Sequence, residues 1–388
     1  MLSEMSKTRW SCAAIFLLPG LCYSLLTSRM PALKSNAGVD DFQIGIALLS
    51  LGLIGFLGLS ASSYLAKKLT NKLILGASSI CLCLGTLIAG SAENFFALAA
   101  GFSLGGLGIG LLDSLMNAQG MFFERKYKTR SMNLFHAFYS LGAIIGSVSA
   151  SFCAAYFVNP FFNYLFVAVP GTALCLFCLR YLIEGDHPDS APKKIEKSTI
   201  KLPTVIFVLG ILAMLCYVAE GTVAEWGSLF LEGDKRADAA LAALVYGMFS
   251  ATIFLVRLVG DRVRQWVGDF RLIPLCFVVA FLGMMIVLTA PNPYLSLLGY
   301  LIMGVGISPI VPTLFSLGGK VQGVPAAKVS SLIALFAYSG LLVFPPSIGW
   351  IANHSSLGKA LTIVLAICAV SFLISLLLAK QKKQFNLS

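Results

Sequence analysis

Long apolar runs alternate with short polar stretches along the whole chain. Twelve runs are made mainly of Leu, Ile, Phe, Ala and Gly. A membrane-spanning helix needs about 20 such residues, so each run predicts one span. A transmembrane β-barrel would show alternating segments of roughly 10 residues, which the continuous apolar run 361–378 excludes. The predicted spans are 10–33, 42–66, 73–91, 94–121, 132–158, 161–183, 202–231, 237–258, 271–290, 293–318, 326–352 and 357–379.

The composition agrees with this pattern. Of the 388 residues, 58% are hydrophobic and 12% are charged, and the mean hydropathy is +0.87. Soluble domains carry roughly 25% charged residues. The composition therefore excludes a soluble enzyme, a disordered chain and a disulfide-rich secreted module, and it predicts an all-α polytopic membrane protein.

A polar stretch divides the chain into two halves. Residues 184–201 have no apolar period and predict a flexible cytoplasmic linker between a six-helix bundle over 1–183 and a second over 202–388. Both bundles enter from the same side, which predicts parallel repeats. The other loops are short and no phosphate-binding loop motif occurs, so we expect neither a soluble catalytic domain nor ATP-driven transport.

The positive charges predict the orientation. With both termini in the cytoplasm, 23 of the 28 Lys and Arg lie on the inner side and 4 in outer loops. This asymmetry follows the positive-inside rule and predicts a multi-pass protein of the cell (inner) membrane. It also accounts for the net charge of +11 without a nucleic-acid partner. The first span is too long for a cleavable signal peptide and acts as an anchor.

Cysteines and histidines give no sign of a cofactor or metal. All ten cysteines fall inside predicted spans, where a thiol behaves as a small hydrophobic group. Cys175 and Cys178 have metal-like spacing but no His or carboxylate neighbour. His136, His187 and His354 lie in a span and in two loops on opposite sides, so they form no metal triad. We expect no metal, no cofactor and no enzyme.

The first half places few ionisable groups at membrane depth, where each one costs several kcal/mol unless it faces protein or water. Arg29 lies near the outer end of span one and contacts either an anionic or polar solute or the outer headgroups. Asp113 and Asn117 share a face of span four. With His136, they form either a proton-handling cluster or a structural hydrogen-bond clip.

In the second half, Glu220 and Glu225 lie in the outer part of span seven, followed by Trp226. Burial favours the protonated form of a carboxyl group, so Glu220 is the leading proton carrier, with Glu225 nearer the outer mouth. Trp226 contacts either solute or the membrane interface. Arg29 is the expected partner of Glu220, and a permanent structural pair between them is the alternative.

Small and aromatic residues add further candidates. The Gly142-x-x-x-Gly146 pair predicts close packing of span five. Tyr139 and Tyr338 are candidate solute contacts, and aromatic residues of this kind also suit the cavity of a drug exporter. Broken helices are expected at Gly304, Gly306, Pro309 and Pro312 in span ten and at Pro345 and Pro346 in span eleven.

Several stretches resemble the major facilitator superfamily. The segment Arg257-Leu-Val-Gly260-Asp261-Arg262-Val-Arg264 is similar to its gate motif between spans eight and nine. The resemblance implies that Asp261 pairs with a helix N-terminus or an Arg to hold the outward-open state. The equivalent loop between spans two and three departs from the motif, with Lys67 in place of the usual acid and Thr70 in place of Gly.

Four shorter stretches, 28–31, 112–117, 135–142 and 220–226, resemble the bacterial MosC/YbjJ-like branch of this superfamily, with Glu225 where that branch usually has Asp. The resemblance implies a twelve-helix fold whose cavity is lined by spans one, four, seven and ten. Arg29, Asp113 and Glu220 lie on three of these spans.

These features predict a monomeric secondary active transporter in the lipid bilayer. It moves a small polar solute, sugar-like or carboxylate-bearing, by alternating access coupled to protons. Glu220, Asp113, His136 and Glu225 are the proton-coupling candidates. The solute candidates are Arg29, Asn117, Trp226, Tyr139 and Tyr338. The alternatives are an exporter of drugs or metabolites and a non-transporting membrane sensor.

Overall fold

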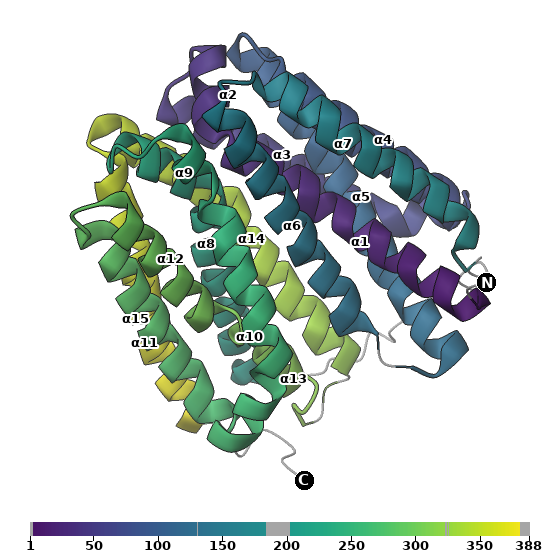
Figure 1. Ribbon diagram of the computed structural model, residues 1–388. Helices are drawn as coiled ribbons and strands as arrows, with labels where there is room; N and C mark the ends of the chain where they lie inside the picture. The colour runs from purple at the N-terminus through teal and green to yellow at the C-terminus, as the bar shows by residue number, and fades with distance from the viewer. Residues whose placement is uncertain (1–2, 130, 184–201, 323, 325, 381–388) are drawn as a thin grey trace. The chain divides into compact units, whose positions relative to one another are not determined.

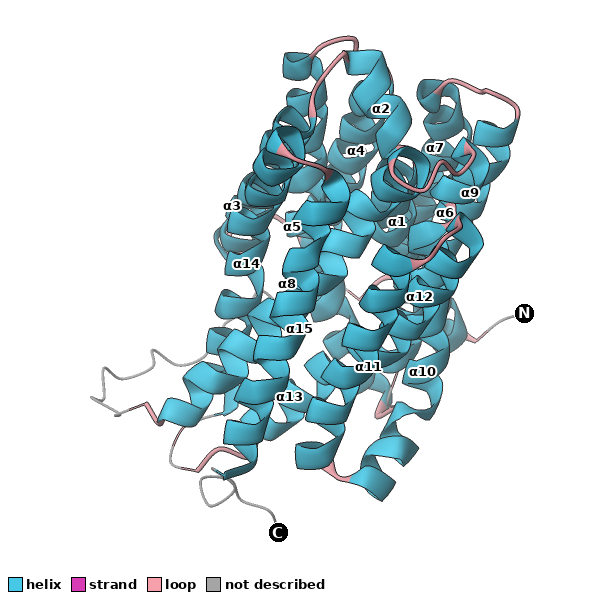
Figure 2. Cartoon of the chain, turned by 90° about the vertical axis from the view of Figure 1, so that its left-hand side faces the viewer, coloured by secondary structure: helices cyan, strands magenta, loops and turns pink. Residues whose placement is uncertain are grey.

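The structure of the chain, a computed structural model, describes residues 3–129, 131–183, 202–322, 324 and 326–380. Every regular element in these residues is helical (Figure 2). Twelve helical segments are long and apolar enough to span a membrane, which confirms the predicted all-α membrane fold. The helices are α1 (Glu4–Ser28), α2 (Met30–Ala37), α3 (Asp41–Leu65), α4 (Asn71–Gly90), α5 (Phe95–Tyr127), α6 (Met132–Ala155), α7 (Pro160–Cys178), α8 (Thr204–Gly233), α9 (Ala239–Ala243), α10 (Val245–Val267), α11 (Asp269–Thr289), α12 (Pro293–Ile307), α13 (Ile310–Gly318), α14 (Ala326–His354) and α15 (Leu357–Lys380), with one 3-10 turn at Leu179–Tyr181.

The chain folds into two compact units. Unit 1 comprises Met1–Ile195 together with Asp238–Gly247, and unit 2 comprises Glu196–Ala237 and Met248–Ser388. Helix α9 and the first turn of α10 therefore belong to unit 1, although they follow α8 of unit 2 in the sequence. The predicted linker, 184–201, lies outside the described residues.

Close packing of helix backbones holds unit 1 together. Helix α1 lies beside α6 (Figure 1), and α3 lies beside α5. A Cβ atom at Gly142 would lie 2.1 Å from the carbonyl oxygen of Leu17, so only glycine allows α6 to approach α1 this closely. This contact confirms that the Gly142 and Gly146 pair serves helix packing.

Close approach of helix backbones at glycine also occurs in unit 2. Helix α11 packs on α12 and α15, and α8 packs on α14 and α15. A Cβ atom at Gly283 of α11 would lie 2.4 Å from the backbone nitrogen of Met303 in α12. Small residues therefore set the spacing of these helices, as is usual where lipid replaces water around a bundle.

Two spans are interrupted at prolines. Span one divides into α1 and α2 next to Pro31, and span ten divides into α12 and α13 at Pro309. Proline has no backbone N–H to donate to the preceding turn, so each of these prolines leaves one backbone hydrogen bond of its span unmade. The predicted break in span ten is confirmed.

The expectation for span eleven is wrong. Helix α14 continues from Ala326 to His354 with Pro345 and Pro346 inside it. A third interruption, which no proline marks, separates α9 from α10 at Leu244 in span eight.

Candidate functional site

Arg29 lies at the joint between α1 and α2 and is only 7% exposed. Its Nη2 donates a hydrogen bond of 2.8 Å to the carbonyl oxygen of Val158, in the connection between α6 and α7. Its Nη1 is buried and has no partner in the described chain. The guanidinium is thus anchored on one side within unit 1 and retains an unused donor on the other.

Other polar groups at this end of unit 1 also lack partners. The hydroxyl of Ser28 and both side-chain amide atoms of Asn163 are buried and form no hydrogen bond within the described residues. Tyr164, the neighbour of Asn163, donates to the carbonyl oxygen of Leu25 at 3.0 Å. An unpaired buried polar group is unfavourable by about 1–3 kcal/mol. The Ser28 hydroxyl and the Asn163 amide are therefore candidates for binding a polar group from outside the described chain.

Asp113 and Asn117 lie one turn apart on α5, and both are half-buried. The Asn117 Nδ2 donates to the backbone oxygen of Asp113 at 2.7 Å and to its carboxylate Oδ1 at 3.3 Å. The structure therefore brings these two predicted residues together. A neutral amide donor leaves the charge of the Asp113 carboxylate uncompensated by Asn117.

His136 and Tyr139 share a face of α6 and are half-buried. The His136 ring packs edge-on against Phe16 of α1, with ring centroids 5.2 Å apart. The backbone of Tyr139 meets Gly20 of α1. Both residues therefore lie along the contact between α1 and α6, and the grouping of His136 with Asp113 stays a prediction.

In unit 2, Glu220 lies half-buried on α8. Its carboxylate is within electrostatic range of the Arg257 guanidinium on α10 and of the Cys216 thiol one turn earlier. Arg257, which the sequence analysis assigned to the gate motif, is thus the cation near Glu220 within this unit. The pairing of Glu220 with Arg29 stays a prediction.

The region around Glu220 adjoins the break between α12 and α13. The Cys216 sulfur lies 3.9 Å from the carbonyl oxygen of Ile307, the last residue of α12. The hydroxyl of Ser308 donates to the carbonyl oxygen of Ile253 on α10 at 3.1 Å. Three segments, α8, α10 and the interrupted helix, therefore meet at the level of Cys216.

Glu225 and Trp226 are both buried, at 6% and 0% exposure. The indole Nε1 of Trp226 has no hydrogen-bond partner in the described chain. An interfacial Trp normally places this N–H in water, so the burial argues against a simple interface role. The Trp226 indole instead provides a buried, unused donor on α8.

Tyr338 of α14 pairs with Tyr217 of α8 in unit 2. Their ring centroids are 5.9 Å apart, and both side chains are half-buried. Tyr217 precedes Glu220 by three residues, so it lies on the same side of α8. The pair gives unit 2 two aromatic rings close to the half-buried Glu220.

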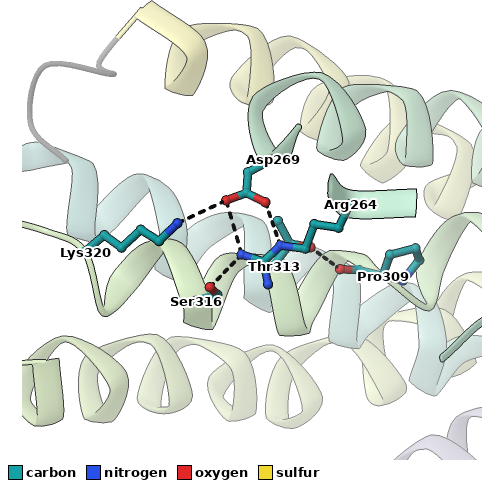
Figure 3. Close-up of polar contacts among 6 residues, drawn as sticks. All are labelled: Arg264, Asp269, Pro309, Thr313, Ser316 and Lys320. Atoms are coloured by element: carbon teal, nitrogen blue, oxygen red, sulfur yellow. Dashed lines mark hydrogen bonds and ion pairs between the residues drawn. The ribbon is translucent and has the colours of Figure 1, made fainter. Parts of the chain in front are cut away.

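The pairing expected for Asp261 in the gate motif stays a prediction. The side chain of Asp261 lies outside the described residues, and Arg262 is exposed. Arg264 forms a two-pronged ion pair with Asp269, with Nε–Oδ1 at 2.6 Å and Nη2–Oδ2 at 3.1 Å (Figure 3). The carboxylate described near this motif is therefore Asp269, at the start of α11.

The Arg264–Asp269 pair also contacts α13, the second helix of the interrupted span ten. Arg264 Nη2 donates to the hydroxyl of Ser316 in α13 at 2.5 Å, and Lys320 lies 3.8 Å from Asp269 (Figure 3). On the same short helix, the Thr313 hydroxyl donates to the carbonyl oxygen of Pro309 at 2.7 Å. The cluster thus joins the end of α10, the start of α11 and the end of α13.

A comparison with known families decides the class of protein. A family model described as the Major Facilitator Superfamily matches residues 12–345. The chain belongs to the major facilitator superfamily. It is accordingly a multi-pass membrane transporter by family and fold, and not an enzyme.

Relatives of this superfamily member cover nearly its whole length. It is 26% identical over 362 residues to an uncharacterized MFS-type transporter of Yersinia pestis, covering 92% of this chain and 91% of the relative. It is 25% identical over 354 residues to the membrane protein MosC of Rhizobium meliloti, covering 91% and 85%. The resemblance predicted from the sequence is confirmed.

A solved structure, that of the nucleoside transporter NupG, is similar with a TM-score of 0.79 at 12% sequence identity. The match covers 96% of this chain and 99% of NupG. At this identity, the likeness supports the major facilitator fold alone.

Three polar residues with defined contacts or burial, Asp269, Asn163 and Ser147, are not among the residues predicted from the sequence. An acidic residue directly after Gly268 and before an apolar run is a normal helix-start signal, and it could have drawn attention to Asp269. Asn163 and Ser147 are uncharged polar residues inside apolar helices. Only their burial and contacts distinguish them from many other residues of the same kind.

Outside the spans, Lys235 closes the connection after α8. Its Nζ donates to the carbonyl oxygens of Leu288 at 2.8 Å and Ala290 at 2.7 Å, at the end of α11. Burial lowers the pKa of the Lys235 ammonium from its ordinary value of 10.5, and the neighbouring Asp234 acts in the opposite direction. The described residues contain no group of three His, Cys, Asp or Glu side chains suited to a metal ion.

Proposed function

We propose that this superfamily member carries a small polar solute across the cell membrane by alternating access, coupled to proton movement. The solute is sugar-like or carboxylate-bearing. The protein works as a monomer with both termini in the cytoplasm. Glu220 is the principal proton carrier, and Asp113, His136 and Glu225 assist.

The observation that carries this proposal is the state of Glu220. Its carboxyl group lies within an apolar span and forms no hydrogen bond or ion pair with the described residues, yet it lies in the field of Arg257. A charge at this depth is costly unless protein or water compensates it. A carboxylate held this loosely can release its proton and later regain it, which a firmly paired structural carboxylate does poorly.

The solute contacts follow from the unused donors. Arg29 Nη1 in unit 1 and Trp226 Nε1 in unit 2 are buried without partners. A guanidinium matches a carboxylate or phosphate, and an indole N–H matches a hydroxyl or carbonyl oxygen. Asn117, Tyr139 and Tyr338 supply further polar edges, so the solute is expected to carry both hydroxyl and anionic groups. NupG, which has a similar fold, is a nucleoside transporter, and a nucleoside is a polar solute of this kind.

The test begins with a thermal-shift screen of the detergent-purified chain. Pentoses, hexoses, nucleosides and small carboxylates are compared with the lipophilic cation tetraphenylphosphonium. The compound with the largest shift is radiolabelled, and its accumulation is measured in proteoliposomes under an imposed pH gradient. A sodium gradient of equal size tests the coupling ion.

The decisive variants are Glu220→Gln and Asp113→Asn. Glu220→Gln should abolish accumulation driven by the pH gradient and retain exchange of labelled for unlabelled solute. The matched control is Glu4→Gln, since Glu4 is an exposed carboxylate paired with Lys126 at 3.1 Å. If Glu220→Gln and Asp113→Asn both accumulate solute as the unchanged protein does, the assignment of proton coupling to these residues is refuted.

A second candidate function is export of an aromatic or lipophilic compound. The Tyr217 and Tyr338 ring pair favours it, because aromatic faces attract cations and pack against flat apolar molecules. This function requires tetraphenylphosphonium to give the largest shift and Tyr338→Ala to remove it. Saturable binding without any flux would instead indicate a sensor.

A further inference from the structure

The interruption of span eight has an unusual cause. Helix α9 ends at Ala243 and α10 begins at Val245, with no proline or glycine at the break. In an uninterrupted helix, the Gly247 N–H would donate to the carbonyl oxygen of Ala243. Instead, the Ser147 hydroxyl of α6 donates to the Ala243 oxygen at 2.6 Å and accepts from the Gly247 N–H at 3.2 Å. The Ser147 hydroxyl is thus bonded to both backbone groups that would bond to each other in an uninterrupted helix.

The surroundings hold this hydroxyl closely in place. Ser147 is 0% exposed. A Cβ atom at Gly247 would lie 2.5 Å from both the Cβ and the Oγ of Ser147, so only glycine fits there. The next residue back, Tyr246, packs edge-on against Tyr23 of α1 with ring centroids 5.7 Å apart. The first turn of α10 is therefore docked on α6 and α1, all within unit 1.

The break also lies where α10 changes its associations. Asp238–Gly247 belongs to unit 1, and the rest of α10, from Met248, belongs to unit 2. A side chain inserted into the backbone hydrogen bonds of a helix is a known cause of a kink. The geometry of span eight at this break is thus set by Ser147, a residue of a different helix of unit 1.

We propose that Ser147 is a positioning residue that keeps span eight broken in one conformation and releases it in another. When α6 withdraws, the Gly247 N–H bonds directly to the Ala243 oxygen, and α9 and α10 become one helix. The Ser147 hydroxyl then returns to a carbonyl of its own helix. Every hydrogen-bonding group keeps a partner, so the two forms are close in free energy. The role of this switch in transport rests on the proposed function, whereas the switch itself does not.

Hydrogen–deuterium exchange tests the switch without any solute. The full-length protein in phospholipid nanodiscs is compared with Ser147→Ala over 244–248. The variant should form the direct Ala243–Gly247 bond, and a backbone hydrogen bond contributes about 1 kcal/mol, which corresponds to roughly fivefold slower exchange. The matched control is Ser149→Ala, because the Ser149 hydroxyl donates at 2.8 Å to Gly146 of its own helix. It should leave exchange over 244–248 unchanged.

A second variant approaches the contact from the other side. In Gly247→Ala, the new methyl group would collide with Ser147 and expel it, so exchange over 244–248 should again slow. The double variant should match the single variants, since both remove the same contact. Faster or unchanged exchange in Ser147→Ala and Gly247→Ala would overturn the proposal, because loss of a purely structural contact loosens a helix. Slower exchange without solute flux would support the switch and refute the transport function.

Discussion

The strongest single prediction concerns the ion pair that ties α13 to its neighbours. In Asp269→Asn, the amide keeps one acceptor oxygen but loses the negative charge and the two-pronged contact with Arg264. Arg264 then holds Ser316 with a guanidinium that lacks its counter-charge. We expect the end of α13 to detach more often from α10 and α11, while the membrane-embedded helices stay folded.

The magnitude follows from the burial of the pair. The Arg264 and Asp269 side chains are 22% and 14% exposed, and their nitrogen–oxygen distance is 2.6 Å. Exposed pairs contribute about 0.2–1 kcal/mol, and removing one partner of a buried pair is unfavourable by about 3–5 kcal/mol. A mostly but not fully buried pair lies between these limits, at about 2 kcal/mol. This figure corresponds to a roughly thirtyfold larger population of the detached form.

Hydrogen–deuterium exchange over 313–319 measures this population directly. Asp269→Asn should accelerate exchange there by about thirtyfold, since the open form is the one that exchanges. The matched control is Lys320→Gln, because Lys320 is 43% exposed and lies 3.8 Å from the same carboxylate. It should change exchange by less than about fivefold. If the two variants behave alike, the Arg264–Asp269 pair does not hold α13, and the reasoning from burial is refuted.

Because burial lowers the pKa of Lys235, the folded protein binds that proton more weakly than the unfolded chain does. The free energy of unfolding should therefore rise as the pH increases toward 10.5. Denaturant unfolding at several pH values should show a smaller rise with pH in Lys235→Met than in the unchanged protein. Gly142→Ala should destabilise the protein by about 1–3 kcal/mol, since its methyl group would lie 2.1 Å from the Leu17 oxygen. The control is Gly260→Ala, because Gly260 has open space around it. Equal melting temperatures of the two variants would contradict the packing argument. Tyr164→Phe should cost about 1 kcal/mol by removing the 3.0 Å hydrogen bond to Leu25; unchanged unfolding would mean that this bond adds nothing.

The fold was predictable because the bilayer imposes a simple rule on the chain. A span must be apolar over about 20 residues, and each such run can be counted from the sequence. The break at Pro309 was also predictable, because the missing N–H is a covalent property of proline. The continuity of α14 was not, since helix neighbours can satisfy the groups that Pro345 and Pro346 leave free.

The candidate site was predictable only where charge marked it. Asp113 and Asn117 share a helix face, and four-residue spacing gives that directly. Arg257 was assigned to the gate by resemblance, whereas its position in the field of Glu220 depends on how α8 and α10 pack. Asp269 looks like an ordinary acid at a helix start. Contacts between residues of different helices depend on how those helices pack. The spacing of residues within one helix gives no information about that packing.

The three interrupted spans differ in a way that bears on motion. At Pro31 and Pro309 the chain lacks a backbone donor, so movement of a neighbouring side chain cannot restore the backbone hydrogen bond that is missing there. At Leu244 both backbone groups are intact, and only the Ser147 hydroxyl keeps them apart. In an apolar environment an unpaired N–H or C=O is strongly unfavourable, so withdrawal of Ser147 forces the two groups together. Of the three interruptions, the one without a sequence marker is therefore the one that can open and close.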